Sequence, residues 1–287
     1  MSFDRFIAID WSGARLPGYR GVAVAMCEAD GRLSLLSPPV GRYWRRMAVH
    51  DWLLGQLAHG RALLIGFDFA FALPFDKAFG FLPGSGRKIL TPASLWQFID
   101  DICAGQDDLY AGAVVEDPTL ARLFWSRGKR PVGFDERLRA TDQACRVAGL
   151  GVPQSVFKLI GAAQVGKGSF AGMRLLHRLQ QQPNLSIWPF APMGGRQSTC
   201  VEIYPSLFIM KARIRKKIRD KSILEDVLRS LDVRLDVAPG GHLDDHACDA
   251  LVSAAALRYY APVAELWRPV AMTAAAHRNE GWIFGLI

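Results

Sequence analysis

Two aspartates end continuous apolar runs, which is where the strands of open α/β sheets place their ligand-binding side chains. Asp10 ends the run 6–9 (FIAI), and Asp68 ends the run 62–67 (ALLIGF). Each run is typical of a buried central strand. If the two strands are neighbours, two carboxylates converge, and like charges then raise one pKa or require a cation. Each aspartate also has a purely structural interpretation, because an aspartate at a strand end can start a turn or cap a helix.

A second group of polar residues begins a late helix, which we expect over about residues 244–260. Asp249 lies four residues after Asp245 and three after His246, so the three side chains gather on one side of that helix. The rest of the helix is apolar nearly all round, so we expect it to be buried, and a buried Asp249 needs a charged or hydrogen-bonding partner. Asp244 is interpreted as the N-cap and Asp245 as a first-turn acid that favours the helix dipole. His246 is either a ligand or a histidine of the core or the surface with its hydrogen bonds satisfied.

Glu202 adds one more carboxylate inside an apolar strand that we expect over residues 199–204. An ion pair with a nearby arginine or lysine is its structural alternative. Mg²⁺ and Mn²⁺ prefer carboxylate oxygens, and two such ions ~3.5–4 Å apart support in-line phosphoryl displacement. The acids together therefore predict a site for a pair of Mg²⁺ or Mn²⁺ ions.

The remaining pattern predicts a single α/β domain over residues 1–287 that carries a helical insertion at about 75–185. A helix over 43–57 joins the two apolar runs as a right-handed β-α-β crossover. The insertion is expected to hold helices over 94–103, 135–148 and 169–182. Further strands are expected over residues 21–26, 32–36, 185–188 and 282–284.

Charge favours a polyanionic partner, nucleic acid first, although solubility alone could explain it. The chain has 287 residues, with 35 Lys and Arg against 27 Asp and Glu, a net charge of +8 and a pI near 9.4. Lys167 lies in a Gly-Lys-Gly segment suited to a phosphate contact. A basic run is the second candidate for nucleic-acid binding, and its residues are Lys211, Arg213, Arg215, Lys216, Lys217 and Arg219. A solvated surface is the alternative for this run.

Other features argue against membrane and secreted classes. No apolar run is long enough to span a membrane, and the N-terminal apolar stretch is too short for a signal peptide. Five widely spaced cysteines without a C-x-x-C favour a reducing environment, so we expect a cytoplasmic protein.

Five short segments of the chain, in this order, resemble segments of the DUF429 family, a predicted nuclease group with an RNase H-like fold. The segments are 7–10 (IAID), 65–68 (IGFD), 201–205 (VEIYP), 245–251 (DHACDAL) and 280–284 (EGWIF). The motif His-x-x-Asp-Ala-Leu at 246–251 is also similar to the closing motif of RuvC-type Holliday-junction resolvases. The resemblance implies a mixed five-stranded sheet whose first, fourth and fifth strands are parallel, flanked by helices. It also implies a metal-dependent nuclease in which Asp10, Asp68 and Asp249 hold metal and Asp245 or His246 assists.

Three other functions are considered. Residues 161–169 approach the phosphate-binding G-x-x-x-x-G-K-[ST] pattern, but Gly168 replaces the hydroxyl residue that should bind Mg²⁺. Residues 10–13 are faintly similar to the phosphate hairpin of actin-like kinases, which share the RNase H core. A non-catalytic nucleic-acid-binding protein would account for the basic residues equally well.

Overall fold

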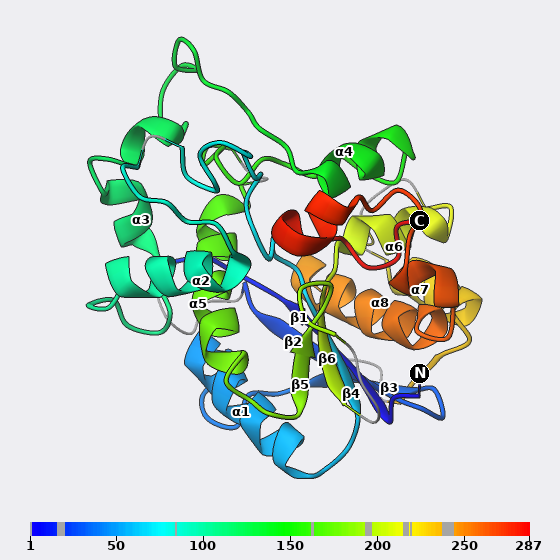
Figure 1. Cartoon of the computed structure of the whole chain (residues 1–287). Helices are drawn as coiled ribbons and strands as arrows, with labels where there is room; N and C mark the ends of the chain where they lie inside the picture. The colour runs from blue at the N-terminus through cyan, green and yellow to red at the C-terminus, as the bar shows by residue number, and fades with distance from the viewer. Residues whose placement is uncertain are drawn as a thin grey trace.

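The computed structural model describes residues 2–15, 21–83, 85–161, 164–192, 197–214, 218, 220–236 and 244–287. Over these residues the centre of the molecule is a mixed seven-stranded sheet in the order β5-β6-β4-β1-β2-β3-β7 (Figure 1). Its strands are β1 (Arg5–Asp10), β2 (Ala23–Glu28), β3 (Arg32–Leu36), β4 (Leu63–Phe67), β5 (Leu185–Ile187), β6 (Ser198–Glu202) and β7 (Arg234–Leu235). The helices are α1 (Arg46–Ala58), α2 (Pro92–Ile102), α3 (Gly112–Glu116), η1 (Ala121–Leu123), α4 (Ala140–Val147), α5 (Gly166–Leu179), α6 (Pro205–Lys211), α7 (Lys221–Ser230), α8 (Asp245–Tyr260), η2 (Ala264–Trp267) and η3 (Ala276–Glu280).

The centre of the sheet follows the predicted β-α-β unit. β1 and β4 are parallel neighbours in the register Ile9↔Phe67, and α1 lies between them in sequence. β6 pairs in parallel with the other edge of β4, whereas β2 is antiparallel to both β1 and β3. The expected parallel pairing of the two apolar runs is confirmed, and both strands are buried along nearly their whole length.

The expectation of a five-stranded sheet is wrong, because the sheet formed by the described residues has seven strands. β5 adds a parallel strand beyond β6, and β7 adds a parallel strand beyond β3. β7 has two residues, which is too short for any periodicity to be visible in the sequence.

Alternating side chains of β1 face two different hydrophobic layers. Ile7 and Ile9 belong to a cluster with residues of α1, α2 and α5, whereas Phe6 and Ala8 belong to a cluster with residues of α6, α7 and α8. Figure 1 accordingly shows α1 and α5 on one side of the sheet and α8 on the other. The strands therefore form the middle of three layers, as expected for a sheet whose strands are apolar on both faces.

α8 packs closely on the centre of the sheet. A Cβ atom added at Gly66 in β4 would lie 2.7 Å from Ile203 Cγ2 and 2.9 Å from Leu257 Cδ1 of α8. The glycine thus lets the helix approach the strand more closely than any side chain would allow. α8 is buried nearly all round, as its sequence predicts.

Two predicted elements differ from the structure. The helix expected over 135–148 begins only at Ala140, because Asp135 Oδ1 accepts a hydrogen bond from Arg137 N (3.1 Å) and holds the preceding residues in a turn. The strand expected over 282–284 is reduced to a single bridge between Ile283 and Glu202. Gly281 and Gly285 have φ of 79° and 99° and turn the chain on both sides of that bridge.

All the described helices between β4 and β5 lie in the segment where the insertion was expected, and in Figure 1 they occupy one side and the top of the molecule. The five cysteines are all free and buried. Among the described residues, no helix combines the length and the apolar character needed to cross a bilayer.

Candidate functional site

The two strand-end aspartates lie side by side at the carboxyl edge of the sheet. Asp10 is the last residue of β1, and Asp68 follows the last residue of β4. The backbone N–H of Asp68 donates to the carbonyl of Ile9 (3.0 Å), so the parallel pairing continues up to both acids. Asp10 is 5% exposed and Asp68 is partly buried. The predicted convergence of these two residues is therefore confirmed at the level of the backbone.

α8 brings the third set of side chains to the same edge. Asp244 Oδ1 accepts a hydrogen bond from Ala247 N (2.8 Å), so Asp244 is the N-cap, as predicted. The cap places Asp245, His246 and Asp249 in the first two turns of a helix that packs on β1. His246 Nδ1 lies 2.7 Å from Asp10 Oδ1 and shares a hydrogen bond with it. This hydrogen bond raises the pKa of the half-buried His246.

Electrostatics show that the acids act on one another. Burial, followed by the charges of Asp10, Asp249 and Glu202, holds the pKa of Asp68 well above its usual range. Four carboxylates from two strand ends, a third strand and a helix therefore share one region. Each negative charge makes the ionisation of Asp68 less favourable, whereas a cation bound in this region would favour the ionised carboxylate.

Glu202, at the end of β6, is engaged by an arginine. Arg139 Nη1 donates to Glu202 Oε2 (2.7 Å) and Arg139 Nη2 donates to Glu202 Oε1, while Phe71 N also donates to Oε2 (3.0 Å). Arg139 binds Asp142 through a second pair of contacts, and all three charged residues are buried. Burial raises the pKa of Glu202, and Arg139 opposes that shift. Glu202 therefore forms an ion pair with an arginine, which is the structural alternative expected for it from the sequence.

The loop after Asp10 is fixed from two sides. The buried Arg46 of α1 donates through Nη1 to the carbonyls of Ser12 (2.8 Å) and Ala14 (3.0 Å). On the other side, a Cβ atom at Gly13 would lie 2.3 Å from Gly168 N, so the loop backbone touches the first turn of α5. Glycine is required at position 13 by this contact, which leaves no room between the two backbones for a side chain.

The first turn of α5 contains Ser169, the hydroxyl residue of the segment 161–169 that approaches the phosphate-binding pattern. The Ser169 hydroxyl donates to Val165 O (3.0 Å), and it accepts from Ala70 N (3.2 Å), which follows β4. This hydroxyl is thus used to join α5 to the carboxyl edge of the sheet. Residues 162 and 163 of the glycine-rich segment lie outside the described residues.

The predicted nucleic-acid contacts fall into different settings. Lys167 is half-buried in the first turn of α5. Lys211 is at the end of α6 with its ammonium 4.7 Å from the centre of the Tyr260 ring, and burial lowers its pKa. Arg213 is exposed at a φ of 63°. The other predicted residues of the run, Arg215, Lys216, Lys217 and Arg219, lie outside the described residues.

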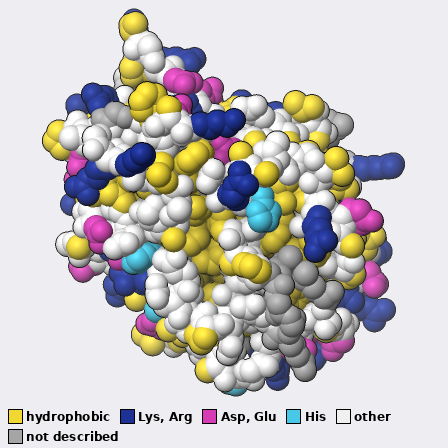
Figure 2. Space-filling view, viewed as in Figure 1, with side chains coloured by type: hydrophobic (Ala, Val, Ile, Leu, Met, Phe, Trp, Pro, Cys, Tyr) yellow, Lys and Arg dark blue, Asp and Glu magenta, His cyan; other side chains and the backbone are white. Residues whose placement is uncertain are grey.

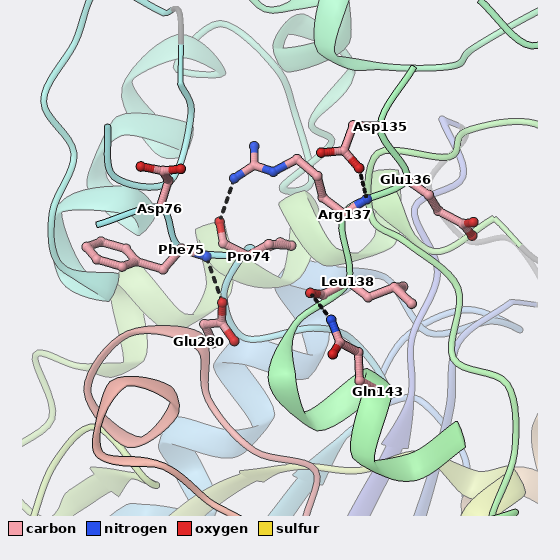
Figure 3. A pocket seen from close by; sticks show the side chains of 9 residues that line it. All are labelled: Pro74, Phe75, Asp76, Asp135, Glu136, Arg137, Leu138, Gln143 and Glu280. Atoms are coloured by element: carbon pink, nitrogen blue, oxygen red, sulfur yellow. Dashed lines mark hydrogen bonds between the residues drawn. The ribbon is translucent and has the colours of Figure 1, made fainter. Parts of the chain in front are cut away.

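A polar hollow of about 410 Å³ lies between the segments 74–76 and 135–138 (Figure 3). Glu280 borders it, with Oε1 accepting from Phe75 N (2.8 Å), Oε2 accepting from Ala140 N (2.8 Å) and its carbonyl accepting from Arg139 Nη1 (3.3 Å). Arg137 reaches across from the opposite side to the carbonyl of Pro74 (3.3 Å). Neither Asp68 nor the three acids that act on it line this hollow.

Sequence reasoning missed Arg46 and Arg139. Arg46 donates to backbone carbonyls 32 to 62 residues away, which no local spacing indicates. Arg139 has a local partner in Asp142, but Glu202 lies 63 residues from it along the chain. Within the part of the chain that the structure describes, no three His, Cys, Asp or Glu side chains form a ready-made metal-ligand group. Comparison with known proteins finds no matching family model, no matching curated protein and no matching solved structure.

Proposed function

We propose that the protein is a metal-dependent nuclease that hydrolyses nucleic-acid phosphodiester bonds, with Asp10, Asp68 and Asp249 as the ligands of Mg²⁺ or Mn²⁺. The observation that carries the proposal is the meeting of Asp10 and Asp68 at the carboxyl ends of the neighbouring strands β1 and β4, where His246 of α8 is hydrogen-bonded to Asp10. Burial and the charges of Asp10, Asp249 and Glu202 raise the pKa of Asp68 at this place. An accumulation of carboxylates at one place is costly to a fold unless a cation is bound there. Hard divalent ions are the cations that carboxylate oxygens suit best.

The order of strands supports an RNase H-like fold. Within the seven strands, the run β3-β2-β1-β4-β6 has two antiparallel pairs followed by two parallel ones. This is the arrangement that the resemblance to DUF429 proteins implies. In that arrangement the acids belong on the first strand, the fourth strand and a late helix, which are β1, β4 and α8 here.

The carboxylates fit a divalent ion by their chemistry. Bound there, divalent ions would convert a water molecule into a nucleophile and neutralise the charge that develops on the leaving oxygen. Because like charges repel, carboxylates in one region separate when no cation joins them. Asp10 is already held by His246, so one of its oxygens has a fixed direction. Glu202 is held by Arg139 and contributes charge beside Asp68 rather than a ligand.

The test is cleavage of plasmid DNA and of single-stranded RNA, in Mg²⁺, in Mn²⁺ and in EDTA. We expect cleavage that requires a divalent ion, is abolished in Asp10→Asn and is retained in Asp226→Asn. Asp226 is a matched control because it is an exposed acid on α7, paired only with Arg229 among the contacts that the structure describes. Equal cleavage by wild type and Asp10→Asn would overturn the proposal.

A non-catalytic nucleic-acid-binding protein is the second candidate. The absence of a ready-made ligand group among the described residues favours it, as does the net charge of +8. Isothermal titration with Mn²⁺ separates the two functions. The nuclease requires Mn²⁺ binding that Asp249→Asn weakens, whereas the binding protein requires none.

A further inference from the structure

An exposed basic loop projects from the helical insertion between η1 and α4. Residues 126–134 read SRGKRPVGF, with three cations and no acid, and residues 126–133 are all exposed. In Figure 1 this part of the chain rises above the rest of the molecule. Figure 2, drawn from the same side, shows dark blue Lys and Arg side chains beside hydrophobic ones on that projection, with magenta Asp or Glu side chains at its base. Sequence reasoning did not single out this loop.

The loop has a braced base. Trp125 N donates to Phe157 O (2.9 Å), and Leu159 N donates to Trp125 O (2.8 Å), so Trp125 is held like a strand residue. The indole N–H of Trp125 donates to Gly128 O (3.1 Å), and its ring meets Phe134 edge to face at 5.9 Å. These contacts tie both ends of the loop to one aromatic pair.

The three cations of the loop have different tasks. Arg130 donates through Nη2 to Phe134 O (3.1 Å) and lies over the Phe134 ring at 5.6 Å, so it is part of the brace. Arg127 and Lys129 are exposed and make no hydrogen bond or ion pair with any residue that the structure describes. Two positive charges are therefore presented on a braced backbone, so a ligand that binds them has only their side chains to order.

The base of the loop is packed against the segment that supports the candidate site. A Cβ atom at Gly166 would lie 2.2 Å from Val156 O and 2.3 Å from Leu159 Cδ2, so the start of α5 rests on the same segment that pairs with Trp125. The next residues of α5 touch Gly13 in the loop after Asp10. Packed contacts thus connect the basic loop to the acid-bearing edge of the sheet.

We propose that Arg127 and Lys129 bind the phosphate backbone of the nucleic-acid substrate outside the cleavage site. The proposal rests on the proposed nuclease function for the identity of the substrate. Phosphate contacts position a nucleic acid without reading its sequence, and they need cations that no acid neutralises. The loop supplies such cations on a fixed support.

An anionic membrane is the competing partner, because Pro131 and Val132 are exposed beside the cations. Membrane affinity grows with the apolar area that is buried, and two small residues bury little. The phosphate chain of a nucleic acid needs no apolar area, so the loop fits it better.

The experiment compares two double variants that each remove two exposed positive charges. Arg127→Ala/Lys129→Ala changes the loop, and Arg61→Ala/Arg234→Ala is the matched control. Arg61 precedes β4 and Arg234 begins β7, so both lie at the sheet edge opposite the acids. Binding of fluorescein-labelled single-stranded and duplex DNA of about 30 nucleotides is measured in EDTA, from about 50 to about 200 mM salt.

We expect the loop variant to bind DNA of any sequence more weakly than the wild type does. Each lost phosphate contact reduces the slope of log K against log salt by ~0.7–0.9, so the two substitutions together should reduce it by about 1.4–1.8. The control variant should keep the wild-type slope. Equal slopes for the two variants would overturn the proposal, and so would an absence of DNA binding. Binding to vesicles of phosphatidylserine and phosphatidylcholine that depends on the loop, without DNA binding, would assign the loop to a membrane instead.

The outcome is separable from that of the nuclease proposal. Loop-dependent binding without metal-dependent cleavage would support the phosphate contact and reject the nuclease. Metal-dependent cleavage with an unchanged salt slope in the loop variant would support the nuclease and reject the contact.

Discussion

The carboxylate of Asp10 and the imidazole of His246 are hydrogen-bonded at 2.7 Å although 236 residues separate them in sequence. The contact joins the end of β1 to the first turn of α8. It also pairs Asp10 with a side chain that can gain or lose a proton. The consequences of this arrangement for stability can be measured.

Stability should fall as pH rises, in the protein without metal. The pKa of Asp68 is raised in the folded state, so the folded protein binds more protons than the unfolded chain above about pH 4, and stability decreases up to the folded pKa. His246 acts in the same direction: its stabilisation is complete below its unfolded pKa of about 6.5 and is lost as pH rises through its raised folded pKa.

Urea unfolding in EDTA between about pH 5 and about pH 8 measures this trend. We expect Asp68→Asn to show a smaller decrease than the wild type, because the amide does not ionise. Added Mn²⁺ should also reduce the decrease. A wild-type stability that rises steadily over this range would contradict the assigned charge cluster.

Asp249→Asn should leave the metal-free protein at least as stable as the wild type, since it removes one of the charges that repel Asp68. Mn²⁺ should stabilise the variant less than it stabilises the wild type, because stabilisation by a ligand follows its affinity. Thermal melts in EDTA and in millimolar Mn²⁺ check both points. If Asp249 instead forms a structural ion pair, its removal would cost ~3–5 kcal/mol in EDTA.

Arg139→Met should be among the most damaging single substitutions. It leaves the buried carboxylates of Glu202 and Asp142 without their shared partner, a loss that typically costs about 3–5 kcal/mol. Arg229→Ala removes an exposed ion pair and should change the midpoint of urea unfolding very little. Adding Glu202→Gln to Arg139→Met removes one stranded charge and should recover part of the loss. No recovery would show that packing, not charge, is the main contribution of Arg139.

Two glycine substitutions should have opposite signs. Gly66→Ala places a methyl group against Ile203 and Leu257 and should destabilise the protein by about 1–3 kcal/mol. Gly55→Ala, in α1, meets no atom within 4 Å and should stabilise the protein by roughly 0.5–1 kcal/mol through helix propensity. Thermal melts of the two variants give the comparison. A harmless Gly66→Ala would mean that α8 can move away from β4.

The parts of the fold that the sequence predicts are those with a local cause. The runs 6–9 and 62–67 are apolar without interruption, so their burial and parallel pairing, and the edge that Asp10 and Asp68 share, follow from the pattern. Asp244 is recognisable as an N-cap because capping involves residues three apart.

The parts that escaped prediction depend on distant partners. Nothing near Arg139 in sequence indicates Glu202, which lies 63 residues away. The turn at Asp135–Arg137, which delays the start of α4, competes with a helical pattern that is locally acceptable. The braced basic loop depends on the contact between Trp125 and the segment around Phe157, which no periodicity announces.

The separation of Asp10 from His246 also affects how quickly the site can form. The contact between Leu63 and Ser198 closes a loop of 135 residues, and the contact between Asp10 and His246 closes one of 236. Each closure costs conformational entropy before any contact compensates for it, and chains rich in such contacts fold slowly. α8 packs on β1, β2 and β4, so the surface that it covers exists only where these strands have paired. Under the proposed nuclease function, cleavage would require the docked α8, so chains in which α8 has not docked would not cleave nucleic acid.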